Sequence, residues 1–221
     1  LPVYITSIGS FLPGEPVDND TAAEFLGPLS RRQERLRRSA LAKNGIRLRH
    51  YGIDRTGAPL FTNAQIAARA VGDALERSEL SPDTLELMCA ASSQGDLLAP
   101  GLASMVHGDM DVPAMEIASF NSFCASGVMA LKSATNAIRS GDKSTAVVCA
   151  SEFASRFLRA GYLEGATPTP DTEFLRWTLS DGAGAAVLEN RPNERGLSLR
   201  IDFIDLVSYA SRFELCMLAV V

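Results

Sequence analysis

The feature that most constrains the fold is a regular alternation of apolar runs and helical patterns between residues 62 and 152. The apolar runs, such as "LELMCAAS" and "STAVVCAS", are short and nearly continuous instead of alternating in polarity. That pattern is typical of strands buried on both faces. Strands that alternate with helices usually form a parallel sheet with helices on both sides. The alternation therefore predicts an α/β fold.

Periodicity and capping residues assign the individual elements. Thr62 and Gln65 predict a capping box at the start of an amphipathic helix whose apolar stripe runs from Ile66 to Leu75. A first strand, "VYITSIGSFLP", is predicted to end at Pro13, and residues 153–178 are expected to be irregular. Further strands are predicted in 83–92, 113–119, 144–152, 181–190 and 197–209, and further helices in 101–110 and 124–140.

Composition and cysteine usage exclude several classes of protein. No apolar run reaches the roughly 20 residues of a membrane span, and no basic leader precedes the N-terminal apolar stretch. The cysteines are far apart and form no CxxC pair, and His50 and His107 are the only histidines. We therefore expect reduced thiols in a cytoplasmic protein, with no membrane partner, no disulfide framework and no metal site. The four cysteines are Cys89, Cys124, Cys149 and Cys216.

Residues 31–49, "RRQERLRRSALAKNGIRLR", form a basic window in an acidic chain. The window holds eight cations and one acid, whereas the whole chain has a net charge of −5. This asymmetry favours a small anionic partner or an acidic protein surface. Nucleic acid is not expected, since it would want wider basicity with interleaved aromatic residues. A solvated helix face is the alternative, and the sequence leaves it open.

The segment "ASFNSFCASGVMALKSA" places Cys124 between a predicted strand and a predicted helix. Ligands of open parallel sheets gather at the carboxyl ends of strands. The free N–H groups at a helix start favour an anion, and a thiolate is such an anion. Cys124 is therefore a candidate nucleophile. The alternative is a buried structural cysteine, which suits the three mid-run or terminal cysteines better.

Four stretches together resemble the ketoacyl synthase III enzymes, a family of thiolase-like condensing enzymes. "SFNSFCASGVMAL" is similar to the active-site segment of that family. "NGIRLRHYGID", "LAPGLASMVHG" and "LSDGAGAAVLE" are similar to further family segments, in the same order and spacing. A softer similarity points to the subgroup that makes dialkylresorcinol and aryl-polyene lipids, and hence to lipid, fatty acid or polyketide biosynthesis.

The resemblance implies a thiolase-like fold made of two similar halves, usually as a homodimer. We expect a mixed, mostly parallel five-stranded sheet with helices on both faces. Residues 1–207 would be the N-terminal half and 208–221 the start of a C-terminal half that is otherwise missing. The apolar end "FELCMLAVV" supports this, because nothing follows to bury it, and the chain also lacks an initiator Met.

The resemblance also implies a reaction. Cys124 would accept an acyl group from acyl-coenzyme A or an acyl carrier protein, and a decarboxylated malonyl unit on its carrier would attack it to give a 3-oxoacyl product. No cofactor is expected. Arg47 and Arg49 fall in the matching segment and would bind substrate. Two alternatives stay open: transfer of the acyl group to an alcohol or amine, and a non-catalytic partner subunit that shapes another chain's pocket.

Two features depart from the family pattern. The catalytic His and Asn of the family come from its second half, and neither His50 nor His107 takes a matching place. Leu98-Ala99-Pro100 stands where many relatives have a large aromatic residue before the proline, which hints at a roomier acyl pocket. Asp181, in "DGAGA", is expected to be structural, because those glycines lead into a strand and not into a phosphate-binding helix.

Overall fold

The computed structural model describes residues 1–163 and 169–214, which divide into two compact units. Unit 1 comprises residues 1–12, 62–152 and 182–206. Unit 2 comprises residues 13–61 and 153–181 and the described residues from 207 onward. The predicted division of the chain at residue 207 stays a prediction, because residues 215–221 lie outside the described part.

Unit 1 is built on a six-stranded sheet of order β5-β4-β6-β7-β1-β8. β4 is parallel to β5 and β6, whereas β7 is antiparallel to β6 and β1, and β8 is antiparallel to β1. Four strands therefore run in one direction, which confirms the mixed, mostly parallel sheet. The strands are β1 (Tyr4–Phe11), β4 (Leu87–Ala91), β5 (Glu116–Phe120), β6 (Thr145–Glu152), β7 (Gly182–Glu189) and β8 (Leu199–Arg200).

The five long strands were all predicted, and β8 adds a sixth of only two residues. The prediction of a strand over 197–209 is wrong beyond Arg200. Residues 201–209 form no strand, and Phe203, Val207 and Tyr209 are exposed. Their apolar pattern resembled a strand, but no described strand pairs with them.

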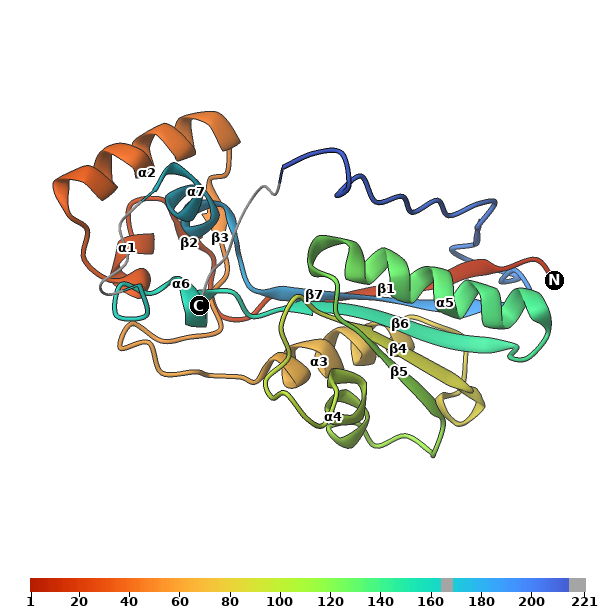
Figure 1. Cartoon of the computed structure of the whole chain (residues 1–221). Coiled ribbons are helices and arrows are strands. Elements are labelled where there is room, and N and C mark those ends of the chain that lie inside the picture. The colour runs from red at the N-terminus through yellow and green to blue at the C-terminus, as the bar shows by residue number, and fades with distance from the viewer. Residues whose placement is uncertain (164–168, 215–221) are drawn as a thin grey trace. The chain divides into compact units, whose positions relative to one another are not determined.

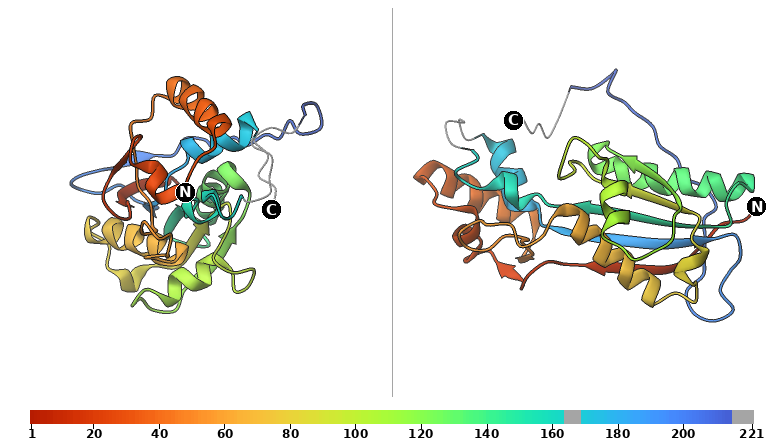
Figure 2. Two further views of the ribbon diagram at one scale, coloured as in Figure 1. Left: turned by 90° about the vertical axis from the view of Figure 1, so that its left-hand side faces the viewer. Right: turned by 90° about the horizontal axis from the view of Figure 1, so that it is seen from below.

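Helices cover both faces of the sheet in unit 1, as predicted (Figure 1; Figure 2). α3 (Asn63–Glu76) packs on β1, β6 and β7, with α4 (Leu102–Gly108) beside it. α5 (Ser126–Ser140) packs on β4, β5 and β6 from the other face. The predicted capping box is present: the Thr62 hydroxyl accepts the N–H of Gln65, whose side chain accepts the N–H of Thr62.

Gly9 sets how closely β1 approaches α3. A Cβ at this position would lie 2.2 Å from the backbone N of Ala74 and 2.5 Å from the carbonyl O of Ala70. Both are backbone atoms of α3, so they cannot move aside without bending the helix. The strand and the helix can therefore touch only because residue 9 has no side chain.

The described part of unit 2 contains four helices and a two-stranded ribbon. The described residues form α1 (Ala22–Leu26), α2 (Arg31–Asn44), α6 (Ser155–Leu158) and α7 (Pro170–Thr178). β2 (Val17–Asp18) pairs antiparallel with β3 (Leu48–Arg49). The expectation that residues 153–178 are irregular is wrong for α6 and α7. Pro170 suggested a loop, but it occupies the first turn of α7, where proline is favoured, behind a capping box of Thr169 and Thr172.

The core of unit 2 contains buried charges. Arg176 and Glu173 are 0% and 2% exposed, and their charged groups lie 3.7 Å apart. Glu173 also accepts the indole N–H of Trp177 at 2.8 Å. The guanidinium groups of Arg37 and Arg176 lie 5.1 and 5.3 Å from the centre of the Trp177 ring. Burial lowers the pKa of Arg176, although the neighbouring Glu173 opposes the shift.

Candidate functional site

Cys124 lies in a 3₁₀ turn, η2 (Phe123–Ala125), that joins the end of β5 to the start of α5. Cys124 is exposed, whereas Cys89 and Cys149 are buried in strands of the same sheet. Burial raises the pKa of Cys89 to about 11 and that of Cys149 to about 12, so both remain thiols near neutral pH. Cys216 lies outside the described residues. Among the described cysteines, Cys124 is thus the one that a reagent can reach.

The turn at Cys124 has an unusual backbone. Phe123 has a φ of +45°, in the left-handed region that non-glycine residues rarely adopt. The carbonyl of Phe123 accepts hydrogen bonds from the N–H and, at 2.6 Å, from the hydroxyl of Ser126. No side chain caps the start of α5. The N–H groups there are therefore left without a side-chain acceptor, and such groups favour a bound anion.

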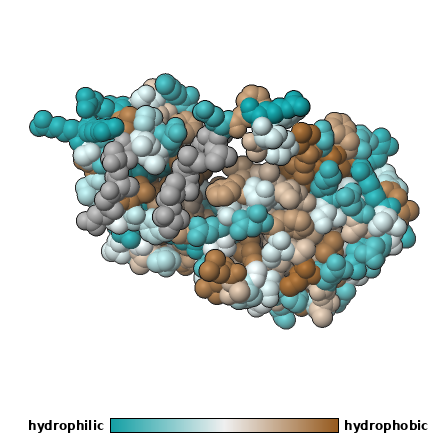
Figure 3. Space-filling model, in the orientation of Figure 1, coloured by the Kyte–Doolittle hydropathy of each residue, from teal (hydrophilic) through white to brown (hydrophobic). Residues whose placement is uncertain are grey.

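Apolar side chains surround the turn on the accessible surface of unit 1. Phe123, Val128 and Met129 are 63%, 41% and 38% exposed. Figure 3 shows apolar side chains among polar ones on the face of unit 1 that carries α5. Such a surface can accommodate an apolar group next to the thiol.

Close packing against the sheet explains why residue 127 is a glycine. A Cβ on Gly127 would lie 3.2 Å from the Cβ of Ala150 in β6, which is tighter than ordinary contact. The missing side chain therefore lets α5 sit close to the sheet.

A network of polar side chains holds the carboxyl ends of β4 and β6 in place at one end of the sheet. Asn63 donates to the Ser92 hydroxyl at 2.9 Å and accepts from the Ser151 hydroxyl at 2.6 Å. Glu152 accepts the N–H of Ser93 at 2.6 Å. Sequence reasoning missed these residues, since single Asn and Ser residues carry no pattern. Their hydrogen bonds hold the loops that follow β4 and β6 in one position.

The two predicted substrate-binding arginines have different surroundings in unit 2. Arg47 is exposed. Arg49 is only 1% exposed, and its guanidinium donates to the carbonyl of Trp177 and, at 2.6 Å, to Asn19. With its donors engaged inside the unit, Arg49 acts as a structural residue here. The prediction of substrate binding is not supported for Arg49, and it stays a prediction for Arg47.

The basic window forms α2 and the segment after it. Ser30 and Gln33 form a capping box at the start of α2. The cations on its exposed side are solvated, and Glu34 pairs with Arg37 at 3.2 Å and with Arg38 at 3.1 Å. The solvated-face interpretation and the anionic-partner interpretation both remain compatible with this geometry. The exposed cations of the window are Arg31, Arg32, Arg35, Arg38, Lys43 and Arg47.

Asp181 is structural, as expected. It is 1% exposed and accepts hydrogen bonds from the N–H of Gly52, at 2.6 Å, and from both the N–H and the hydroxyl of Ser155. Burial raises the pKa of Asp181, and these hydrogen bonds oppose the shift. The carboxylate thus ties three segments of unit 2 together.

Neither histidine has surroundings that suggest catalysis. His50 Nδ1 lies 3.1 Å from the carbonyl of Gly14, and His107 Nε2 lies 3.1 Å from the carbonyl of Pro113. Within residues 1–163 and 169–214, no group of three His, Cys, Asp or Glu residues is placed to hold a metal ion. No helix in that same part of the chain has the length and apolar character to cross a membrane.

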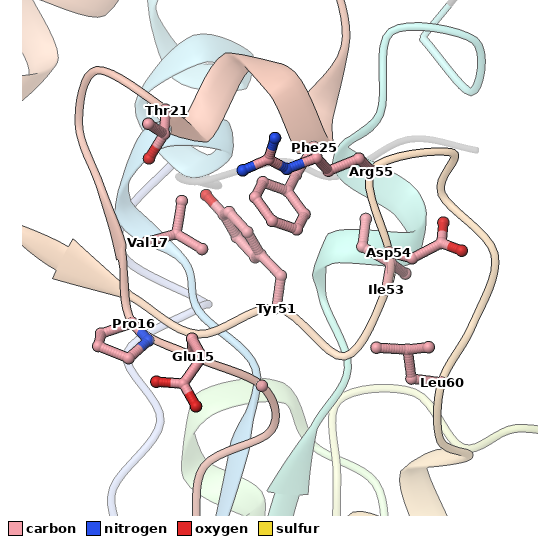
Figure 4. Close-up of a pocket in the computed structure, with 11 residues that line it drawn as sticks. Glu15, Pro16, Val17, Thr21, Phe25, Tyr51, Ile53, Asp54, Arg55 and Leu60 are labelled. Carbon is pink, nitrogen blue, oxygen red and sulfur yellow. The ribbon is translucent and has the colours of Figure 1, made fainter.

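A pocket of about 350 Å³ lies entirely within unit 2 and does not include Cys124 (Figure 4). Phe25 and Tyr51 form much of its wall, with ring centres 5.6 Å apart. Arg55 at its rim pairs with Glu24 at 3.1 Å. Burial raises the pKa of Tyr51 to about 12, and its hydroxyl is buried with no hydrogen-bond partner among the described residues. A ligand in the pocket could not reach this hydroxyl, so we assign the pocket no role.

Comparison with known proteins gives relatives among the 3-oxoacyl-(acyl-carrier-protein) synthase III enzymes. Residues 119–204 match the family model of 3-oxoacyl-(acyl-carrier-protein) synthase III. The chain is 30% identical over 204 residues to a beta-ketoacyl-(acyl-carrier-protein) synthase III of Jannaschia sp. (strain CCS1), covering 86% of this chain and 54% of that protein. The chain thus spans about half the length of the curated relatives it matches.

Solved structures agree on the fold. The structure of AbyA1, a tetronic acid condensing enzyme, matches with a TM-score of 0.72 and 30% identity, over 87% of this chain and 56% of that one. The 3-oxoacyl-(acyl-carrier-protein) synthase III of Aquifex aeolicus VF5 matches with a TM-score of 0.66 and 21% identity, over 87% and 55%. These matches confirm the thiolase-like fold and the resemblance predicted from the motifs.

Proposed function

We propose that this chain, which is related to the 3-oxoacyl-(acyl-carrier-protein) synthase III enzymes, supplies the acyl-accepting cysteine of a condensing enzyme. The observation that carries the proposal is the place of Cys124. It is an exposed thiol at the start of an uncapped helix, inside the segment that matches the family model. The other described cysteines are buried and have raised pKa values.

The reaction has two half-reactions. The Cys124 thiolate attacks the carbonyl carbon of an acyl thioester, a new C–S bond forms, and the thiolate of coenzyme A or the carrier leaves and takes up a proton from solvent. A malonyl thioester then loses carbon dioxide, and its enolate carbon attacks the acyl-enzyme. The bond to Cys124 breaks, which restores the thiolate and releases a 3-oxoacyl thioester. The family resemblance assigns the His and Asn that assist these steps to the second half of the fold.

Phe123, Val128 and Met129 offer apolar surface to the acyl chain. The exposed cations of α2, together with Arg47, suit the phosphates of coenzyme A or an acidic carrier. Each of these residues thus has a role in binding or orientation.

The acylation step can be tested by mass spectrometry on the complete protein. After incubation with an acyl thioester, we expect one acyl adduct, on the peptide that contains Cys124, and none in the Cys124→Ala variant. An adduct on Cys89 or Cys149, or no adduct on any cysteine, would contradict the proposal. Carbon dioxide release that depends on malonyl thioester separates condensation from acyl transfer to an alcohol or amine, because transfer of that kind releases none.

A homodimer in the cytoplasm is the assembly that we propose. β5 is an edge of the sheet among the described strands, and Ile117 on it is 37% exposed. An unpaired strand edge with apolar side chains is a natural place for a second chain to pair. Native mass measurement of the complete protein should give twice the subunit mass. A complex with a different chain would instead favour the partner-subunit alternative.

A further inference from the structure

The residue before Cys124 is in a strained conformation. Phe123 has a φ of +45°, and a non-glycine residue in the left-handed region costs about 1–3 kcal/mol. Such a conformation persists only where its surroundings hold it. The Phe123 side chain is 63% exposed, so packing of the ring holds little of it. The restraint must come from hydrogen bonds to the backbone of the turn.

Ser126 supplies that restraint. Its hydroxyl donates to the carbonyl of Phe123 at 2.6 Å, and its own N–H donates to the same oxygen. The Ser126 residue is 3% exposed, so its hydroxyl is shielded from competing water. One further bond closes the turn, from the N–H of Ala125 to the carbonyl of Ser122 at 3.2 Å.

We propose that Ser126 is a positioning residue for the Cys124 thiol and acts through the backbone of Phe123. The proposal rests on the proposed function for its catalytic meaning, but it concerns the geometry of the turn. Without the hydroxyl, Phe123 relaxes toward the right-handed region, and its carbonyl and the next peptide plane rotate. Cys124 follows that peptide plane directly, so its side chain leaves the position that the intact turn gives it beside the start of α5.

Alkylation by iodoacetamide measures this positioning without any substrate. The thiolate sulfur displaces iodide, a C–S bond forms, and the iodide ion leaves. The rate at Cys124 is followed at pH 7 by mass spectrometry of its peptide in the complete protein. In the Ser126→Ala variant we expect this rate to fall about fivefold, the effect of one typical hydrogen bond.

Ser140→Ala is a matched control. The Ser140 hydroxyl makes the same kind of bond, three residues back to the carbonyl of Ala137 at 2.9 Å, at the other end of α5. It should leave the alkylation rate unchanged. Ser126→Thr keeps a hydroxyl and should recover most of the rate. A residue that served stability alone would change the unfolding midpoint but not the alkylation rate of Cys124 in the folded protein.

Repeating the Ser126→Ala change in a Phe123→Gly variant tests whether Ser126 acts through the backbone of Phe123. Glycine adopts a positive φ without strain, so Phe123→Gly should make the hydroxyl of residue 126 dispensable. Ser126→Ala should then slow alkylation less than twofold in that background. An undiminished fivefold effect there, or no effect of Ser126→Ala in the otherwise unchanged protein, would overturn the proposal. Alkylation responds even if no acyl thioester labels Cys124, so the two proposals fail separately.

Discussion

The two units of this chain bury different kinds of side chain. The core of unit 1 is made of small and aliphatic residues, and its buried polar groups are neutral. All four charged side chains that are buried among the described residues lie in unit 2: Arg49, Glu173, Arg176 and Asp181.

This difference indicates how each unit is stabilised. A core of small aliphatic residues depends on close packing, and adding or removing a single methyl group changes its stability. A core with buried charges depends on complete pairing, because removing one partner leaves the other uncompensated.

Two probes can follow the units separately. Trp177, the single tryptophan of the chain, reports on unit 2, and the protection of Cys89 and Cys149 from thiol reagents reports on unit 1.

The largest effect is expected at the contact between β1 and α3. Gly9→Ala places a Cβ at 2.2 Å from a backbone atom, and we expect it to lower the free energy of unfolding of unit 1 by about 4 kcal/mol. Gly72→Ala is the control on the same helix, since a Cβ there meets nothing within 4 Å. It should be neutral or slightly stabilising. The measurement is the urea dependence of Cys149 labelling. Similar midpoints for the two variants would contradict the close-packing account.

A smaller but still large effect is expected from the buried pair in unit 2. Arg176→Met leaves Glu173 buried without its cationic partner, which should cost about 3 kcal/mol. The midpoint of the Trp177 fluorescence transition in urea should fall accordingly. Arg38→Met, which removes an exposed partner of Glu34, should leave that midpoint unchanged. An Arg176→Met midpoint equal to that of Arg38→Met would show that the buried pair does not stabilise unit 2.

The pH dependence of unit 1 should show the smallest effect. Burial raises the pKa of Cys149 to about 12, so the folded state keeps a proton that the unfolded chain loses above its ordinary value of 9.0. The contribution of this thiol is complete below pH 9 and is lost as the pH rises toward 12, by about 1.4 kcal/mol per pH unit. Cys149→Ala should flatten the fall in stability between pH 9 and 11. Val148→Ala, beside it, should lower stability without changing that slope.

The elements that the sequence predicted well are those that local chemistry decides. The capping box at Thr62 and Gln65 and the apolar runs of the long strands depend on residues close in the chain, and the structure confirms them. α7 was missed because proline occurs both in loops and in the first turn of helices, where Pro170 lies. The buried position of Arg49 was not predicted, because its partner, the carbonyl of Trp177, lies 128 residues away. No local pattern shows such a contact.

The position of β5 links assembly to reactivity. β5 is an outer strand of the described sheet and ends at Phe120, four residues before Cys124. Four residues span at most about 14 Å of extended chain, so any molecule that adds a strand to this edge comes near the sulfur. If the proposed homodimer pairs along this strand, the rate at which the thiol reacts should depend on protein concentration, and the kinetics at this one cysteine would report the assembly.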